Sequence, residues 1–161
     1  SALYFLTRNP SVQVYLFEPV PRNIERLRKN LRGYEKRYEL SECAIGVDGG
    51  ECDFAYEDTG RYGGLINNGL SRFAKTTSDK VISVKVLAVN QTLDKILSNH
   101  ESVDVVKIDI EGYENEILGR LKAGTLARIE RIYAETNSNQ TFLGFSRERY
   151  GGVMRYYRTR G

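Results

Sequence analysis

The stretch of sequence that decides the fold is Val103–Gly112, which reads VDVVKIDIEG. Its β-branched apolar residues predict a buried, central strand over Val103–Ile110. Gly112 then lets the backbone turn at close quarters into a helix predicted over Glu114–Leu121. A strand, a tight turn and a helix in this order are typical of an α/β domain.

Three charged residues alternate along this strand: Lys107, Asp109 and Glu111. An extended strand places them on one face. Because charges on a buried strand are costly, we interpret the two carboxylates as functional, with Lys107 holding them ionised. The alternative is structural: an ion pair at the strand end, followed by Glu111 and Glu114 in favourable interaction with a helix N-terminus.

The rest of the chain alternates between strand-like and helix-like segments. Strands are predicted over Val12–Phe17, Tyr38–Ile45, Cys52–Tyr56, Ile82–Val86 and Ile129–Ala134, and helices before Asn9–Pro10, after Pro21 and after Thr92. This order predicts one α/β domain over residues 1–161, with a doubly wound, mainly parallel sheet.

Two segments do not fit this alternation. Asp58–Asn68 is rich in glycine and predicts a mobile loop, in which Tyr56 and Tyr62 form either a lid over a pocket or part of an ordinary surface loop. From Asn137 onward the periodicity fades and the chain becomes basic. We favour a solvated or frayed end over a site for polyanions, although five arginines gather there: Arg147, Arg149, Arg155, Arg158 and Arg160.

Composition narrows the classes of function. The 161 residues, 40% hydrophobic and 28% charged, are typical of one globular domain, and a net charge of +3 does not indicate nucleic acid as the main partner. Cys43 and Cys52 lack metal-ligand spacing, and His100 is the single histidine, which excludes a histidine-based metal site or triad. No apolar run approaches the roughly 18 residues of a membrane span. We expect a cytoplasmic protein with no metal and no membrane partner.

Acidic residues follow three of the predicted strands: Glu18, then Asp109 and Glu111, then Glu135. The carboxyl ends of parallel strands share one edge of a sheet, and ligands bind there. A ligand with hydroxyls or positive charge would stabilise several acids in one place. Glu18 stands where nucleotide-binding folds place an acid that accepts hydrogen bonds from two ribose hydroxyls, and it fits equally well as an acid at a helix start.

Small side chains mark the end of the second predicted strand, at Cys43 and Ala44. They leave room for a flat ring against the backbone, but core packing is the commoner role of such residues. Cys52 falls on an apolar alternating face and is expected to be unreactive.

Four motifs carry a family resemblance: VYLFEP at 14–19, ECAIG at 42–46, TLD at 92–94 and, most specifically, VKIDIEG at 106–112. Together they resemble the FkbM-type methyltransferases, over a span from about Val12 to Glu135. The resemblance implies an S-adenosylmethionine-dependent enzyme of the Rossmann-like, doubly wound methyltransferase fold. It also implies methylation of a hydroxyl on a sugar or another small-molecule acceptor.

The resemblance further implies roles for individual residues. Glu18 would hold the cofactor ribose, and the backbone of Cys43–Ala44 would lie against the adenine. Asp109 would face the methionine end of the cofactor or the acceptor, with Glu111 and Glu135 lining the same mouth. Asp109 or Glu111 is the implied base, although positioning of the two reactants can suffice for this chemistry.

The chain also departs from the family pattern. The family's first strand and glycine loop precede the first helix, but no glycine occurs before Gly33, and the basic end shows no match to the last two strands. We therefore expect a truncated domain with impaired cofactor binding and exposed sheet edges that favour homo-oligomers. The alternative to an enzyme is a non-catalytic nucleoside-binding or protein-interaction module. Nucleic-acid binding through the arginines is the least favoured hypothesis.

Overall fold

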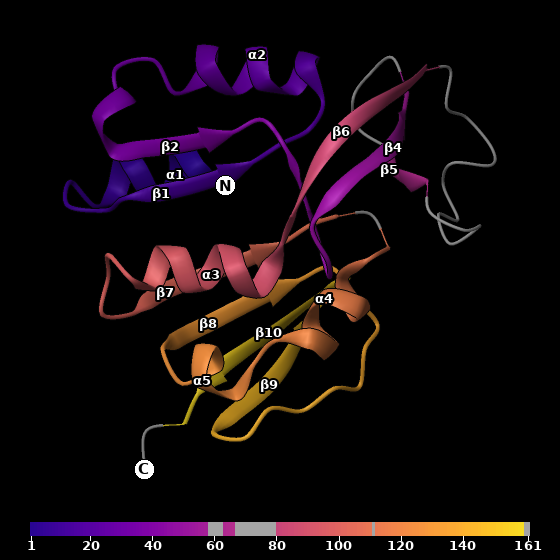
Figure 1. The fold of residues 1–161 in the computed structure, drawn as a ribbon. Coiled ribbons are helices and arrows are strands. Elements are labelled where there is room, and N and C mark those ends of the chain that lie inside the picture. The colour runs from indigo at the N-terminus through magenta and orange to yellow at the C-terminus, as the bar shows by residue number, and fades with distance from the viewer. Residues whose placement is uncertain (58–62, 67–79, 111, 160–161) are drawn as a thin grey trace.

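The computed structural model describes residues 1–57, 63–66, 80–110 and 112–159. Within these ranges the chain is a mixed α/β protein whose strands form one two-stranded and two four-stranded sheets (Figure 1). None of the helices in these ranges combines the length and the apolar character that crossing a bilayer requires.

The two-stranded sheet joins β1 (Val14–Phe17) and β2 (Tyr38–Ser41) in parallel. Helices α1 (Ala2–Arg8) and α2 (Pro21–Asn30) pack on one face of it, where Val14 and Leu16 meet the buried Leu6 of α1. Proline at the first position of α2 suits a helix start because its φ is already helical. The predictions for Val12–Phe17 and for both helices are confirmed.

The main core surrounds a four-stranded sheet of order β7-β8-β10-β9. Its strands are β7 (Val103–Ile108), β8 (Ile129–Ala134), β9 (Phe145–Tyr150) and β10 (Val153–Arg158). Ile129, Ile132 and Tyr156 are completely buried in it. Three helices contribute to the same core: α3 (Val89–Leu97), α4 (Glu114–Arg120) and α5 (Ala123–Leu126). The helix predicted after Thr92 therefore starts earlier, at Val89.

The second four-stranded sheet, the hairpin sheet, has the order β3-β6-β4-β5. It contains β3 (Ala44–Gly46), β4 (Gly50–Tyr56), β5 (Gly63–Ile66) and β6 (Lys80–Ala88), and confirms the strands predicted over Cys52–Tyr56 and Ile82–Val86. Part of the loop predicted over Asp58–Asn68 is thus a strand. The remainder of that loop, with Tyr62 and the predicted lid, lies outside the described residues.

The α/β class is confirmed, but the prediction of one doubly wound, mainly parallel sheet is not, because the described strands divide among three sheets and both larger sheets are mixed. The segment Tyr38–Ile45 is two strands. A tight turn interrupts it, in which the Cys43 N–H donates to the Ser41 carbonyl at 3.0 Å, and β3 then pairs with β6. Strand β7 is also not central, since within the described ranges it pairs only with β8 and lies at a sheet edge.

The predicted frayed end is wrong as well, because residues 145–158 form the hairpin β9–β10 that completes the main sheet. The absence of the last strands, expected from the family pattern, is therefore corrected. Met154 and Tyr156 alternate with polar neighbours and are buried in the core. The arginines bind protein groups: Arg155 pairs with Glu148 at 2.7 Å, and the Arg158 Nε donates to the Ile129 carbonyl at 2.9 Å.

Candidate functional site

The candidate site lies at the carboxyl ends of the parallel strands. Figure 1 shows the arrowheads of β2 and β8 pointing to the same side of the molecule. Because β1 is parallel to β2 and β7 is parallel to β8, all four strands end on that side. The residues that follow β1, β7 and β8 are Glu18, Asp109 and Glu135.

Glu18 is a half-buried carboxylate at the end of β1. Its backbone N–H donates to the Ser41 carbonyl at 3.1 Å, and its Oε1 accepts the Val20 N–H at 2.9 Å. Burial raises the pKa of Glu18, and hydrogen bonds from the Val20 backbone and the Asn23 side chain oppose this only in part. The charge of Glu18 is thus incompletely compensated by the protein, so hydroxyl donors on a ligand would stabilise it.

Asp109 and Glu135 follow neighbouring strands in register. Ile108 lies opposite Ala134 in the parallel pair, and the Glu135 N–H donates to the Ile108 carbonyl at 3.4 Å. The next residues, Asp109 and Glu135, therefore lie side by side beyond the last paired positions. Glu18 follows β1 of the two-stranded sheet, and β1 pairs only with β2 in the described ranges.

Two of the three charged residues predicted to share a face, Lys107 at the end of β7 and Asp109 directly after it, are exposed. Lys107 forms an ion pair with Asp109, and their side chains are 42% and 44% exposed. The expected burial of these charges is wrong, because within β7 the deeply buried side chain is that of Ile108, on the opposite face. The pair matches the surface ion pair of the alternative interpretation, while Glu111 lies outside the described residues.

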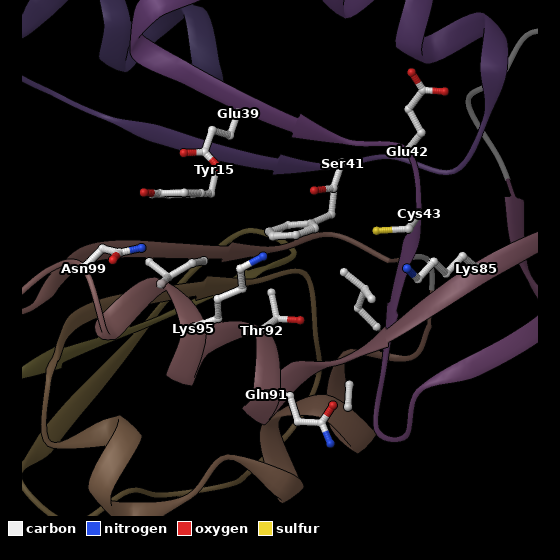
Figure 2. A pocket seen from close by; sticks show the side chains of 14 residues that line it. Tyr15, Glu39, Ser41, Glu42, Cys43, Lys85, Gln91, Thr92, Lys95 and Asn99 are labelled. Carbon is white, nitrogen blue, oxygen red and sulfur yellow. The ribbon is translucent and has the colours of Figure 1, made fainter.

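A cavity of about 520 Å³ lies between the β1–β2 sheet and α3. Tyr15 and Phe17 of β1 line it, and Figure 2 shows the Cys43 sulfur and the Lys95 amino group pointing into it. Glu42 points away (Figure 2) and pairs with Arg28. The cavity therefore combines aromatic faces with a cationic group, a surface suited to a flat, polar ligand.

The two residues expected near the adenine have different surroundings. Cys43 is 3% exposed and lines the cavity, and burial raises the pKa of its thiol against the opposing effect of Lys85. Ala44 packs with Val84 and Val86 in the core of the hairpin sheet, which is the core-packing alternative. Cys43 and Cys52 are both buried, and no disulfide joins them.

Tyr15 connects the β1–β2 sheet with the segment that precedes β7. Its hydroxyl lies 2.7 Å from Nε2 of His100, in the segment that leads into β7. Burial, and then the negative charge of Glu39, raise the pKa of Tyr15, so the phenol stays protonated at neutral pH. This contact joins β1 to the segment before β7, and the strands β1 and β7 do not pair with each other in the part of the chain that the structure describes.

Glu114 holds the turn that follows β7, a role that was not predicted from the sequence. Glu114 is 4% exposed, and its two carboxylate oxygens accept the N–H groups of Ile110 and Gly112, each at 3.0 Å. The sequence predicts for Glu114 only a favourable interaction with a helix N-terminus. The spacing E-G-x-E at 111–114 is the one signal for it, since a side chain two residues beyond Gly112 can reach back to the turn.

The side chains that follow the parallel strands offer oxygen atoms that accept hydrogen bonds. Glu18 can accept hydrogen bonds from hydroxyls, and Asp109 and Glu135 can accept protons or hydroxyl hydrogen bonds. Such a set suits a polyhydroxylated ligand.

Comparison with known proteins identifies the family to which the chain belongs. A family model described as the methyltransferase FkbM domain matches residues 1–161. The 2-O-methyltransferase NoeI of Sinorhizobium fredii (strain NBRC 101917 / NGR234) is 29% identical over 150 residues, which cover 87% of this chain and 60% of that protein. No solved structure matches the chain. With strand-end acids in place and a family match along all 161 residues, the chain belongs to the FkbM methyltransferase family.

Proposed function

We propose that the protein is an S-adenosylmethionine-dependent methyltransferase that methylates a hydroxyl of a sugar or a similar small molecule. Family membership and a relative named as a 2-O-methyltransferase support the reaction class. The observation that carries the proposal is the half-buried Glu18. It follows β1, which ends on the same side of the molecule as β7 and β8, the strands that Asp109 and Glu135 follow (Figure 1). We include a Rossmann-like arrangement of the complete protein in this proposal.

The residues present fit the cofactor at Glu18. One carboxylate oxygen already accepts the Val20 N–H, and burial disfavours the charge of the group. Two vicinal hydroxyls, as on ribose, would donate to the remaining lone pairs and stabilise the ionised form. Cys43 is the neighbour proposed beside the adenine, since it lies two residues beyond the end of β2 and lines the cavity. When bound, S-adenosylmethionine supplies the methyl group that the acceptor oxygen receives.

Asp109 is the residue we propose to take the proton that the acceptor hydroxyl loses. Its carboxylate forms an ion pair with the Lys107 ammonium at the end of β7, and a carboxylate oxygen can accept a proton from an acceptor hydroxyl. Glu135, in register on the next strand, would orient the acceptor through its hydroxyls. We also propose that Glu111 lines the same site, as the family resemblance implies.

The test is calorimetric titration of the full-length protein with S-adenosylmethionine and with its demethylated product, followed by a radiolabel transfer assay. We expect both nucleosides to bind, and label to appear on acceptors with free hydroxyls but not on their fully methylated counterparts. Absence of binding refutes the proposal. Binding without transfer to any hydroxylated acceptor refutes catalysis and supports the non-catalytic nucleoside-binding module.

A further inference from the structure

We propose that the first turn of α4 is a positioning element for this reaction, because Glu114 and Asn115 hold the turns that carry Asp109 and Glu135. Neither residue has to touch the reactants. Each acts through a hydrogen bond to the turn after one of two neighbouring parallel strands. The inference rests on the proposed function, which assigns the chemical roles to Asp109 and Glu135.

Glu114 is committed entirely to the turn after β7. It is the first residue of α4 and is 4% exposed. Oε1 accepts the Ile110 N–H and Oε2 accepts the Gly112 N–H, each at 3.0 Å. A buried carboxylate is costly unless its oxygens are satisfied, and here both oxygens are satisfied by the turn that begins at Asp109.

The turn needs such support because the sheet does not hold it. Residue pairing between β7 and β8 stops at Ile108, so Asp109 lies beyond the last pair. Gly112 has a φ of +94°, a conformation that favours glycine, and glycine adds flexibility. Helix α4, in contrast, is anchored by Ile117 and Leu118, each 1% exposed in the main core. The bonds from Glu114 therefore fix the turn to a rigid element.

Asn115 performs the equivalent task at β8. Its Oδ1 accepts a hydrogen bond from the Thr136 hydroxyl, and Thr136 directly follows Glu135 and is 7% exposed. The Thr136 hydroxyl oxygen also accepts the Ser138 N–H at 3.0 Å, which ties down the next part of the same turn. Two consecutive residues of one helix thus set the position of Asp109 relative to Glu135.

A simple helix-start role for Glu114 would make a different prediction. An acid at that position interacts with the helix dipole from the solvent as well as from the interior, and the interaction is worth little. It does not require burial or two bonds to residues that precede the helix. The observed bonds to Ile110 and Gly112 therefore favour positioning of the turn.

The experiment compares Glu114→Gln with Glu101→Gln in the full-length protein. Glutamine keeps the volume and one acceptor oxygen, but sets an amide NH₂ against the second backbone N–H. Glu101 is a matched control, because it is an exposed glutamate before the amino end of β7. For Glu114→Gln we expect kcat to fall about 10- to 100-fold from misplacement of Asp109, with KM values changed less than about twofold. Hydrogen exchange of residues 108–113 should accelerate, and the control should show neither effect.

Two results overturn the positioning role: exchange at 108–113 equal to that of the control, or a loss of activity confined to KM. If Glu114→Gln does not fold, Asn115→Ala at an exposed helix position replaces it. That variant should lower kcat and accelerate exchange around Thr136, and an unchanged kcat refutes the proposal. Absence of methyl transfer by the wild-type protein refutes the proposed function itself, whereas the exchange measurement decides on the turn without any activity.

Discussion

Replacing Glu18 with glutamine tests the ribose assignment with little change of shape. The glutamine oxygen can still accept the Val20 N–H that Oε1 accepts at 2.9 Å, so the interactions weakened are the hydrogen bond from the Asn23 side chain and the one offered to the ligand. A hydrogen bond to a charged group contributes about 1.5–3 kcal/mol, and about 1.4 kcal/mol corresponds to a tenfold change in affinity. We expect the Kd for S-adenosylmethionine to rise roughly 10- to 100-fold.

The same substitution should have the opposite effect on folding. Because burial raises the pKa of Glu18, the folded state keeps a proton that the unfolded chain releases over the same pH range. Stability therefore falls as pH rises from the ordinary glutamate pKa, about 4.3, through the raised folded value, and stays lower above it. At neutral pH the variant should melt at or above the wild-type temperature, and below the ordinary glutamate pKa this difference should vanish.

Calorimetric titration measures the Kd, and thermal unfolding without ligand at acidic and neutral pH measures the stability. Glu101→Gln, at an exposed position, is the control and should change neither quantity. The reasoning is refuted if Glu18→Gln binds the cofactor as tightly as the wild type. It is also refuted if the variant is less stable than the control at neutral pH, since the charge of Glu18 would then be well compensated in the folded protein.

Three further predictions concern the reaction, the core and the sheet edges. Asp109→Asn should lower kcat about 100-fold or more without a change in melting temperature, because the side chain is 44% exposed; an unchanged kcat in steady-state assays removes Asp109 as proton acceptor. Ile132→Ala should cost about 2–5 kcal/mol in urea unfolding, because Ile132 is completely buried; a cost below about 1 kcal/mol contradicts its place in the core. The chain should self-associate in sedimentation velocity at tens of micromolar, because β1 and β7 each pair on only one side in the described ranges; a clean monomer excludes this.

The elements predicted correctly from the sequence are those determined by neighbours along the chain. Pro21 marks the start of α2 because its own ring sets the backbone angle. The alternation over Ile82–Val86 and the apolar run that begins at Val103 depend on residues that are adjacent in sequence. The same holds for Glu18 and Asp109, whose position after a strand is a local property.

The misjudged elements depend on partners far away in sequence. The arginines of the hairpin β9–β10 make this segment resemble a solvated end. Its strands depend on distant residues, because Arg158 donates to the Ile129 carbonyl 29 residues earlier and Tyr156 packs in the core formed by β7, β8 and helices α3–α5. The division of Tyr38–Ile45 into two strands depends on a turn at Ser41 and on pairing of β3 with β6. The role of Glu114 depends on the direction of one side chain, which no periodicity encodes.

The short passage from β2 to β3 has a mechanical consequence. Only Glu42 and Cys43 separate the end of β2 from the start of β3, and Cys43 lines the cavity. The hairpin sheet also reaches the cavity through Lys85 of β6. Rotation of the hairpin sheet relative to the β1–β2 sheet would therefore displace Cys43 and Lys85 together, and so change the cavity wall that both side chains form.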